Sequence, residues 1–373
     1  MTSPPIRVAV VGTGEFGRNH VRVWRELEGA DLVGIVDANF ERAAKVAAEF
    51  GTRVLPDLKT LAAERVQAVS VAVPTKEHAR VGCELLAAGH DVLVEKPMAS
   101  SLDEADALIA AAKRAGKILQ IGHVERFNPA VAAAQRIVKH PLFFEVHRLG
   151  VFTPRSLDID VVYDVMIHDL DILLTFVDAE IVDVKAVGIP VITDKVDIAH
   201  ARLEFDNGTV ANLTASRVST ERVRKMRLFQ EHEYISMDFA RQDVLRVRVQ
   251  GGVDKASIDE LRAQSATDQL RARSATDELR AGGATAAQPE IGFEKLTTTQ
   301  REPLKAELES FLECVRSRRA TVVDGTAGRR ALAAADRVME GILDHARRVK
   351  IGGTLDSRPN GMREASFTPQ ETR

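Results

Sequence analysis

The chain has 373 residues, of which 45% are hydrophobic, so it is long enough for two domains and a large core. Its 51 lysines and arginines stand against 54 aspartates and glutamates, a formal net charge of -3. This balance gives no electrostatic reason to expect a nucleic acid or a membrane surface as partner, and it favours a small-molecule ligand.

The two cysteines, Cys83 and Cys314, lie far apart and match no metal or redox spacing. We therefore expect two buried thiols and a reducing compartment. The N-terminal residues lack a secretory pattern, and no stretch reaches the roughly 18 apolar residues of a membrane span. The expected location is cytoplasmic.

Strand-like and helix-like segments alternate through the first third of the chain. Apolar runs predict strands at 6–11, 31–38, 66–73, 91–95 and 118–121. Between them, 41–50 and 101–115 are helical patterns, and Ser101 followed by Glu104 suggests a capping box. Alternation of this kind predicts an α/β fold with a doubly wound parallel sheet.

A G-x-G-x-x-G motif follows the first predicted strand and opens a helix. Its glycines allow a tight turn and a close approach to a pyrophosphate, whose charge the helix N-terminus favours. A plain glycine turn is the alternative, but this context favours dinucleotide binding. The motif consists of Gly12, Thr13, Gly14, Glu15, Phe16 and Gly17.

Asp37 lies at the end of the second predicted strand, twenty residues after Gly17. A carboxylate there can accept hydrogen bonds from the adenosine ribose and repel a 2'-phosphate, which favours NAD over NADP. Alternatively, Asp37 caps the helix that follows, and the two roles are compatible.

Two more turns are predicted at the ligand edge of the sheet. Pro74, Thr75 and His78 belong to the first, although His78 could simply begin a helix. The second is Glu95-Lys96-Pro97, in which proline fixes the turn. A lysine is usually a solvated surface charge, but its position at the cofactor edge favours a functional Lys96.

Asp164 and His168 are spaced four apart, which on a helix places both on one side. Histidine exchanges a proton near neutral pH, although a structural ion pair explains the spacing equally well. Asp169 and Asp171 follow and raise the possibility of a metal site. Adjacent carboxylates point to different helix faces and make a poor cage, so we expect no metal.

The order of GTGEFG, Asp37, VPTKEH and EKP resembles the Gfo/Idh/MocA family of NAD(P)-dependent sugar and polyol oxidoreductases. The segments 120–130 (QIGHVERFNPA), 150–154 (GVFTP) and 161–173 (VVYDVMIHDLDIL) resemble its nucleotide-sugar 3-dehydrogenase branch. The resemblance implies that Lys96, Asp164 and His168 surround the hydroxyl being oxidised. The other implied cofactor contacts are the glycine motif, Asp37, Pro74, Thr75, His78 and Glu95.

The resemblance also implies the substrate class and the partners. The substrate would be a UDP-sugar such as UDP-N-acetylglucosamine or a uronate or deoxy relative, bound also by Arg126, Asn128 and Arg155. Both arginines could equally be ordinary surface or interface residues. A homodimer or homotetramer and a downstream aminotransferase are further expectations. Two alternatives are an NAD-dependent inositol or free-sugar dehydrogenase and a non-catalytic NAD-binding protein.

Hydride transfer from a secondary alcohol requires a base within hydrogen-bond reach of the hydroxyl. We expect His168 to be that base, Asp164 its orienting partner, and Lys96 the cation that stabilises negative charge on oxygen. Lys96 as the base is the alternative, and the sequence does not decide between them.

The predicted domains are a Rossmann domain at 1–125 and a domain for substrate binding and oligomerisation at 126–351. The family implies an open, mainly antiparallel sheet in the second. Strand-like runs after residue 140 agree, among them a predicted hairpin with Asn207-Gly208 at its turn. Residues 302–318 and 328–348 are helical patterns. A nine-residue repeat marks 255–290 as a flexible insertion, and 352–373 is expected to be a disordered tail.

Overall fold

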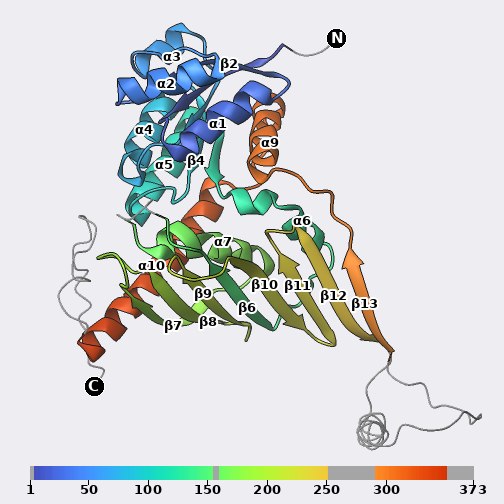
Figure 1. Ribbon diagram of the computed structural model, residues 1–373. Coiled ribbons are helices and arrows are strands. Elements are labelled where there is room, and N and C mark those ends of the chain that lie inside the picture. The colour runs from blue at the N-terminus through green and yellow to red at the C-terminus, as the bar shows by residue number, and fades with distance from the viewer. Residues whose placement is uncertain (1–3, 154–158, 251–289, 351–373) are drawn as a thin grey trace, which may run out of the picture.

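The computed structural model describes residues 4–153, 159–250 and 290–350. Figure 1 shows two domains, a sheet between helices above and a broad sheet carrying helices on one face below. The expected combination of an α/β Rossmann domain with an α+β domain that has an open, mainly antiparallel sheet is confirmed. The repeat insertion and the tail lie outside the described residues, apart from Glu290, which begins a strand.

The sheet of the first domain is entirely parallel, with strand order β2-β1-β3-β4-β5. Because the order reverses direction between β1 and β3, the carboxyl ends of these strands form the crevice in which such sheets bind ligands. The strands are β1 (Ile6–Val11), β2 (Ala30–Val36), β3 (Ala68–Val71), β4 (Asp91–Glu95) and β5 (Leu119–Gly122). The helices are α1 (Glu15–Glu26), α2 (Phe40–Phe50), α3 (Lys59–Ala63), α4 (Thr75–Ala87) and α5 (Leu102–Ala115).

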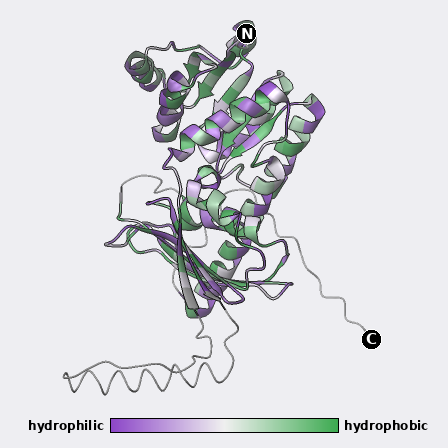
Figure 2. Ribbon diagram, turned by 90° about the vertical axis from the view of Figure 1, so that its right-hand side faces the viewer, coloured by the Kyte–Doolittle hydropathy of each residue, from purple (hydrophilic) through white to green (hydrophobic). Residues whose placement is uncertain are grey.

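Local sequence explains where these helices begin and end. At α5, the Ser101 side chain accepts a hydrogen bond from the Glu104 backbone at 3.2 Å, as predicted. The return bond of the capping box goes instead to the backbone of Ser100, at 2.9 Å from the Glu104 carboxylate. Gly116 ends the helix in the left-handed conformation, with φ 62°, which glycine adopts without strain. Figure 2 shows hydrophobic strands enclosed by helices with hydrophilic outer faces.

The second sheet has eight strands in the order β13-β12-β11-β10-β6-β9-β8-β7, antiparallel except for the parallel pair β6–β9. The predicted hairpin joins β8 to β9, and Gly208 lies in its turn with φ 86°. The strands are β6 (Phe143–Leu149), β7 (Ile181–Ile189), β8 (Ile198–Phe205), β9 (Val210–Ser216), β10 (Val223–Gln230), β11 (Glu233–Asp238), β12 (Asp243–Gln250) and β13 (Glu290–Leu296).

Helices cover the face of this sheet that is turned toward the first domain (Figure 1). Ala331, Val338 and Ile342 of the last helix are buried in the same core as the sheet's apolar side chains. The helices that follow β5 in the chain are the 3-10 helix η1 (Val124–Phe127), α6 (Pro129–Ala134), the π-helix η2 (Val162–Met166), α7 (Ile167–Phe176), α9 (Pro303–Ser317) and α10 (Gly325–Val349).

Helix α9 returns to the first domain although it comes late in the chain. Phe311 meets Trp24 of α1 edge to face, with ring centroids 6.5 Å apart, and Leu308 is buried in the same cluster. Next along the chain, Gly328 of α10 lies against Ile121 so closely that an added Cβ would come within 2.7 Å of a side-chain carbon. The core of the first domain therefore includes residues from beyond 300, which the predicted boundary between residues 125 and 126 leaves out.

Cys314 is buried as expected, but Cys83 is only partly buried, and both thiols are free. Burial raises the pKa of each thiol above its usual value. No helix among the described residues is long and apolar enough to cross a membrane.

Candidate active site

Lys96 lies at the carboxyl edge of the parallel sheet and contacts the second domain. It follows the last residue of β4, and its Nζ donates hydrogen bonds to the backbone carbonyl of Asp164 at 2.6 Å and to Oδ1 of Asp164 at 3.1 Å. The ammonium also lies over the Phe16 ring, 5.7 Å from its centroid. The lysine side chain is 5% exposed and that of Asp164 19%, so the pair is enclosed but within reach of a solute. The structure thus brings together the two residues that the sequence separates by 68 positions.

Asp164 lies in the π-helix η2, and His168 follows in the first turn of α7. The expected arrangement, four residues apart on one regular α-helix, is therefore wrong in detail. A π-helix is closed by hydrogen bonds between residues i and i+5, so the rule that residues four apart lie on one side of an α-helix does not apply here. Such turns are rare and occur frequently at functional sites.

His168 is held in its neutral form. Burial is the main cause that lowers its pKa well below the usual value, and the positive charges of Lys96 and Arg148 lower it further. The ring is partly exposed, yet its Nδ1 is buried without a hydrogen-bond partner among the described residues. A neutral imidazole has a ring nitrogen that can accept a proton.

A second buried histidine, His123, lies beside His168. The two rings meet edge to face, with centroids 6.5 Å apart and planes at 90°. His123 lies in the segment 120–130 that carries the family resemblance, but it was not among the predicted site residues. Its place after a strand of the parallel sheet was the signal that could have identified it.

The predicted substrate residues Arg126 and Asn128 have internal partners in this structure. Arg126 donates from Nε and Nη2 to the two oxygens of Asp171, at 2.7 and 2.9 Å. Asn128 is 1% exposed and caps α6 by accepting from the Ala130 backbone at 3.1 Å. Their assignment as substrate contacts stays a prediction that this geometry does not favour. Arg155 lies outside the described residues.

Two arginines that the sequence did not single out lie near His168. Arg148 is buried on β6 and holds Asp169 through two bonds, at 2.9 and 2.8 Å, and Glu125 through a third at 2.7 Å. Its cross-strand neighbour on β10 is Arg224, whose side of the strand also carries buried core residues. The exposed Arg224 is close enough for its charge to lower the pKa of His168.

The glycine motif has the geometry that a dinucleotide requires. Gly12 has φ 90°, and a Cβ there would lie 2.5 Å from the carbonyl oxygen of Ala72. A Cβ on Gly17 would lie 1.9 Å from the carbonyl oxygen of Gly12. Around Gly14, by contrast, no described atom lies within 4 Å of an added Cβ, so a ligand can approach its backbone closely. These three environments match the turn, the helix packing and the pyrophosphate contact of a dinucleotide loop.

Asp37 organises this loop. It accepts hydrogen bonds from the backbone and hydroxyl of Thr13, at 2.6 and 2.7 Å, and pairs with Arg42 at 2.7 Å. Burial alone would raise the pKa of Asp37, but the hydrogen bonds from Arg42 and Thr13 hold it below the usual value. The alternative role as helix cap belongs to Asn39, whose side chain accepts from the Arg42 backbone.

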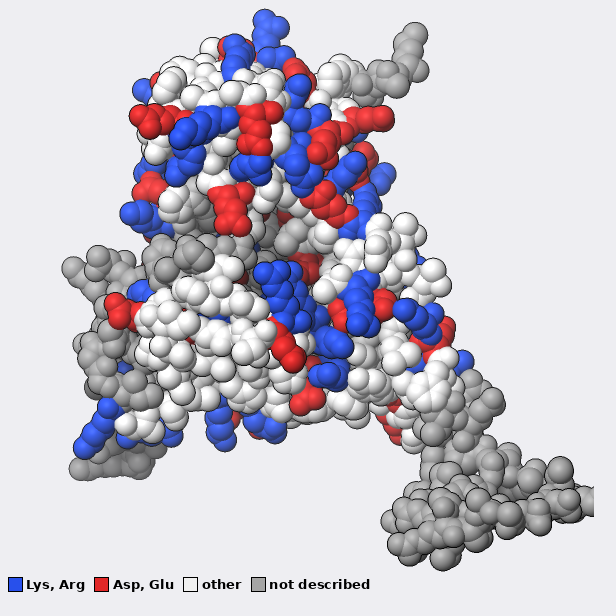
Figure 3. All heavy atoms as spheres, in the orientation of Figure 1, with Lys and Arg blue, Asp and Glu red and all other residues white. Residues whose placement is uncertain are grey.

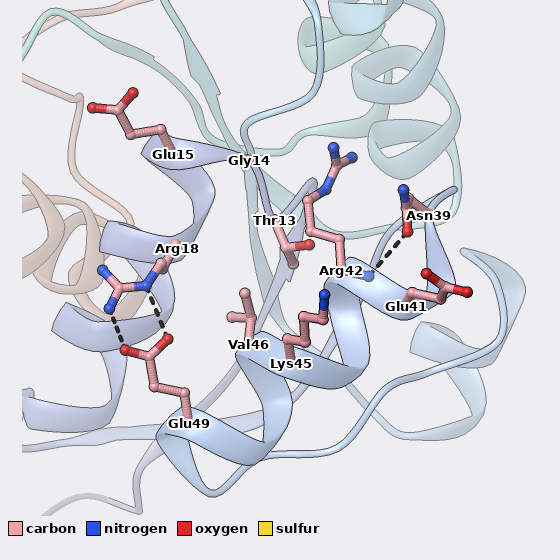
Figure 4. Close-up of a pocket in the computed structure, with 10 residues that line it drawn as sticks. All are labelled: Thr13, Gly14, Glu15, Arg18, Asn39, Glu41, Arg42, Lys45, Val46 and Glu49. Carbon is pink, nitrogen blue, oxygen red and sulfur yellow. Dashed lines mark hydrogen bonds and ion pairs between the residues drawn. The ribbon is translucent and has the colours of Figure 1, made fainter.

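A hollow of about 570 Å³ opens between the first turn of α1 and α2 (Figure 4). Its charged lining residues are three basic side chains, Arg18, Arg42 and Lys45, and three carboxylates, Glu15, Glu41 and Glu49. Such a hollow beside the glycine loop suits the adenosine part of a dinucleotide.

The remaining predicted cofactor residues hold the neighbouring turns. His78 lies in α4 and is buried, with its ring nitrogens 2.8 and 2.9 Å from the carbonyl oxygens of Pro97 and Val73. Glu95 is paired with the buried His20 at 2.9 Å. Burial would raise the pKa of Glu95, but the hydrogen bond from His20 keeps it below the usual value. The other predicted contacts, Glu15, Phe16, Pro74 and Thr75, lie at the starts of α1 and α4.

Among the described residues, no group of three or more histidine, cysteine, aspartate or glutamate side chains is arranged to hold a metal ion. The two aspartates that raised the metal alternative form ion pairs with arginines, Asp169 with Arg148 and Asp171 with Arg126.

Comparison with known proteins identifies the family of this chain. The GFO/IDH/MocA family model, an oxidoreductase family with an NAD-binding Rossmann fold, matches residues 6–123. The family's C-terminal domain model matches residues 144–236. UDP-N-acetylglucosamine 3-dehydrogenase from Acidithiobacillus ferrooxidans is 39% identical over 334 residues, which is 89% of this chain and 96% of that protein. A solved structure of that enzyme has a TM-score of 0.77 at 38% identity, covering 91% of this chain and 98% of the other.

Two further relatives are more distant. Inositol 2-dehydrogenase from Rubrobacter xylanophilus is 34% identical over 195 residues, covering 50% of this chain and 56% of that enzyme. A levoglucosan dehydrogenase solved with NADH and levoglucosan shares the fold, with a TM-score of 0.73 at 18% identity over 91% of this chain and 98% of the other. The chain belongs to the GFO/IDH/MocA family of oxidoreductases. It is an NAD-dependent dehydrogenase acting on CH-OH groups.

Proposed function

We propose that this protein oxidises a secondary hydroxyl, at C3, of a UDP-sugar such as UDP-N-acetylglucosamine to the 3-keto sugar. The main support is the contact of Lys96 with Asp164 across the domain boundary, at 3.1 Å, beside a neutral His168 and close to the glycine loop. Bound NAD supplies the acceptor for the hydride that leaves the alcohol carbon.

Each of the three side chains has a separate task in this proposal. The Lys96 ammonium donates a hydrogen bond to the hydroxyl oxygen and stabilises the negative charge that develops there. The neutral His168 accepts the hydroxyl proton. Asp164 fixes the position of Lys96 through the carbonyl and carboxylate bonds.

The contacts of Lys96 favour its role as a cation over the alternative role as base. A carbonyl oxygen, a carboxylate and the face of the Phe16 ring surround its Nζ, and all three attract a protonated ammonium. His168, in contrast, is neutral and has a partly exposed ring.

A nucleotide diphosphate would meet positive charge at the mouth of the site. Figure 3 shows basic side chains gathered at the rim of the recess between the domains. Arg224, exposed and near His168, is a candidate for a diphosphate contact. The identity with the Acidithiobacillus enzyme over 89% of this chain supports the same substrate class.

The alternative substrates are free sugars or inositols, because the inositol 2-dehydrogenase relative matches half of this chain. A panel decides between them. The purified protein is incubated with NAD and UDP-sugars, free sugars or inositols, and any ketone is trapped with an aminotransferase and glutamate. Product from UDP-N-acetylglucosamine but not from the free compounds is expected. Product only from a free sugar or inositol would contradict the proposed substrate.

Assembly and partners belong to the same proposal. The sheet face opposite α7 and α10 has large exposed side chains such as Phe293 and Leu245, which are 72% and 38% exposed. We propose that this face forms the contact in a homodimer or homotetramer. A keto sugar is a substrate for transamination, so we also propose a cytoplasmic aminotransferase as the downstream partner.

A further inference from the structure

Buried polar groups that the proposed mechanism does not use lie behind His168. His123 is 1% exposed, and neither of its ring nitrogens has a hydrogen-bond partner among the residues that the structure describes. The same is true of Nδ1 of His168. An unpaired buried polar atom costs roughly 1–3 kcal/mol, so both rings require hydrogen-bond partners in the working enzyme.

The two histidines belong to two pairs of residues that face each other. His123 and Arg126 are three positions apart at the 3-10 helix η1, and His168 and Asp171 are three apart on α7. Residues three apart on a helix share a side, so each pair presents two polar groups to the other. Arg126 fixes Asp171 with two bonds, and Oδ2 of Asp171 lies 3.9 Å from Nδ1 of His123.

The step from His123 to His168 is too long for a direct hydrogen bond. At a centroid separation of 6.5 Å the ring nitrogens do not reach the distance that such a bond requires. One water bridges a gap of this size when polar atoms are available on both sides, as the unpaired nitrogens are here.

We propose that Arg126, Asp171 and His123 form a positioning line that acts on His168 through one buried water. The line holds the proton of the neutral ring on Nδ1, which leaves Nε2 to accept the proton of the substrate hydroxyl. This inference rests on the proposed function. Asp171 orients His123 toward the water, and Arg126 holds Asp171 in place.

The proton step balances without a further reactant. The oxygen–hydrogen bond of the alcohol breaks and a bond from hydrogen to Nε2 forms, while the electron pair left on oxygen becomes the second carbon–oxygen bond of the ketone. The carbon–hydrogen bond breaks with its electron pair, and this hydride would go to NAD, the acceptor that the proposed function supplies. The bridging water accepts from Nδ1–H of His168 and donates to His123, and no group of the line changes its protonation state. The negative charge of Asp171 stabilises the imidazolium that results.

Several charged groups act on this line, and each must be considered when its pH dependence is measured. Burial lowers the pKa of His123, whereas the charge of Asp171 raises it. The groups that face the line are Glu95 at the end of β4, Lys96 after it, Arg126 at η1, His168 and Asp171 on α7, Arg148 and Arg224 from the second sheet, and Glu307 on α9.

Two measurements test the line. In the intact protein labelled with 15N-histidine, the NMR shifts of His168 report which ring nitrogen carries the proton, and His168→Gln assigns its signals. We expect the proton on Nδ1. A proton on Nε2 in the wild type would overturn the inference, and this result needs neither turnover nor a variant of the line.

The second measurement is the kinetics of His123→Phe, which keeps a ring but removes both nitrogens. We expect kcat to fall by roughly 10- to 100-fold, with the KM for UDP-N-acetylglucosamine changed by less than about twofold. His123→Gln, which keeps a donor and an acceptor, should recover most of kcat. The ascending limb of the pH profile should move to lower pH in His123→Phe, because the imidazolium loses its connection to Asp171.

The matched control is His90→Phe. His90 is also buried, with one ring nitrogen unpaired within the described part of the chain. It lies just before the first residue of β4, however, whereas Lys96 follows the last. It should retain wild-type kcat. A His123→Phe enzyme within about threefold of wild type would overturn the positioning role while leaving the proposed function intact. A wild type that oxidises no UDP-sugar would instead contradict the proposed function, and the NMR result would still decide the line.

Discussion

Replacing Lys96 by methionine removes the ammonium and keeps an unbranched side chain of similar length. The change removes two hydrogen bonds to Asp164, of 2.6 and 3.1 Å, and the charge over the Phe16 ring. Loss of one donor to a developing oxyanion lowers kcat by about 10²- to 10³-fold, or about 2.7–4 kcal/mol. Because the Asp164 side chain is 19% exposed, destabilisation should stay below the roughly 3–5 kcal/mol of a fully buried broken pair.

The assay is the initial rate of NADH formation with saturating UDP-N-acetylglucosamine and the aminotransferase trap. Calorimetry measures NAD binding and urea denaturation measures the free energy of unfolding, so that lost catalysis is separated from lost cofactor or lost structure. Lys113→Met, on the exposed surface of α5, is the control and should behave as wild type. A Lys96→Met enzyme with normal NAD binding and kcat within about threefold of wild type would refute the reasoning.

Three further predictions concern the cofactor, the substrate and the buried acid. Asp37→Asn should weaken NAD binding and reduce the preference for NAD over NADP, measured as the ratio of the two dissociation constants; an unchanged ratio would remove Asp37 from cofactor choice. Arg224→Ala should raise the KM for the UDP-sugar about tenfold or more with little change in kcat, whereas the exposed neighbour Arg222→Ala should not. The carboxyl group of Glu307 is buried without a hydrogen-bond partner in the described residues, and burial, with the charges of Glu95 and Asp171, raises its pKa well above the usual value. When the pKa of a carboxyl group is higher in the folded than in the unfolded protein, the stability that the protonated group contributes is lost as pH rises above the unfolded-state pKa. The free energy of unfolding then falls by up to about 1.4 kcal/mol per pH unit. In urea denaturation, Glu307→Gln should therefore reduce the fall in the free energy of unfolding above pH 5, while the exposed Glu313→Gln should show the same fall as the wild type. An equal fall in Glu307→Gln and the wild type would contradict the prediction.

The cofactor half of the site could be predicted because its requirements are local. Gly12 and Gly17 are required by backbone contacts within one turn and its neighbouring strand. Lys96 follows β4 directly, so identifying a buried strand was sufficient to place the lysine at the ligand edge. The capping serine of α5 was predicted for the same reason, since its partner is three residues away.

The substrate half depends on contacts between distant segments, which a local pattern does not reveal. Arg126 is bonded to Asp171, 45 residues later, so an arginine that suited a diphosphate in the sequence is an internal group in the fold. The π-helix that carries Asp164 replaces the regular α-helix that the spacing predicted. The relevance of His123 to the site depends on the contact of its ring with that of His168, which the fold alone brings about.

Hydride transfer from C3 is the central claim, and a labelled substrate tests it most directly. The protein is incubated with NAD and UDP-N-acetylglucosamine carrying deuterium at C3, with the aminotransferase trap present, and the mass of the reduced cofactor is measured. We predict NADH that carries one deuterium. Reduced cofactor without deuterium, or no reduced cofactor from this substrate, would contradict oxidation at C3.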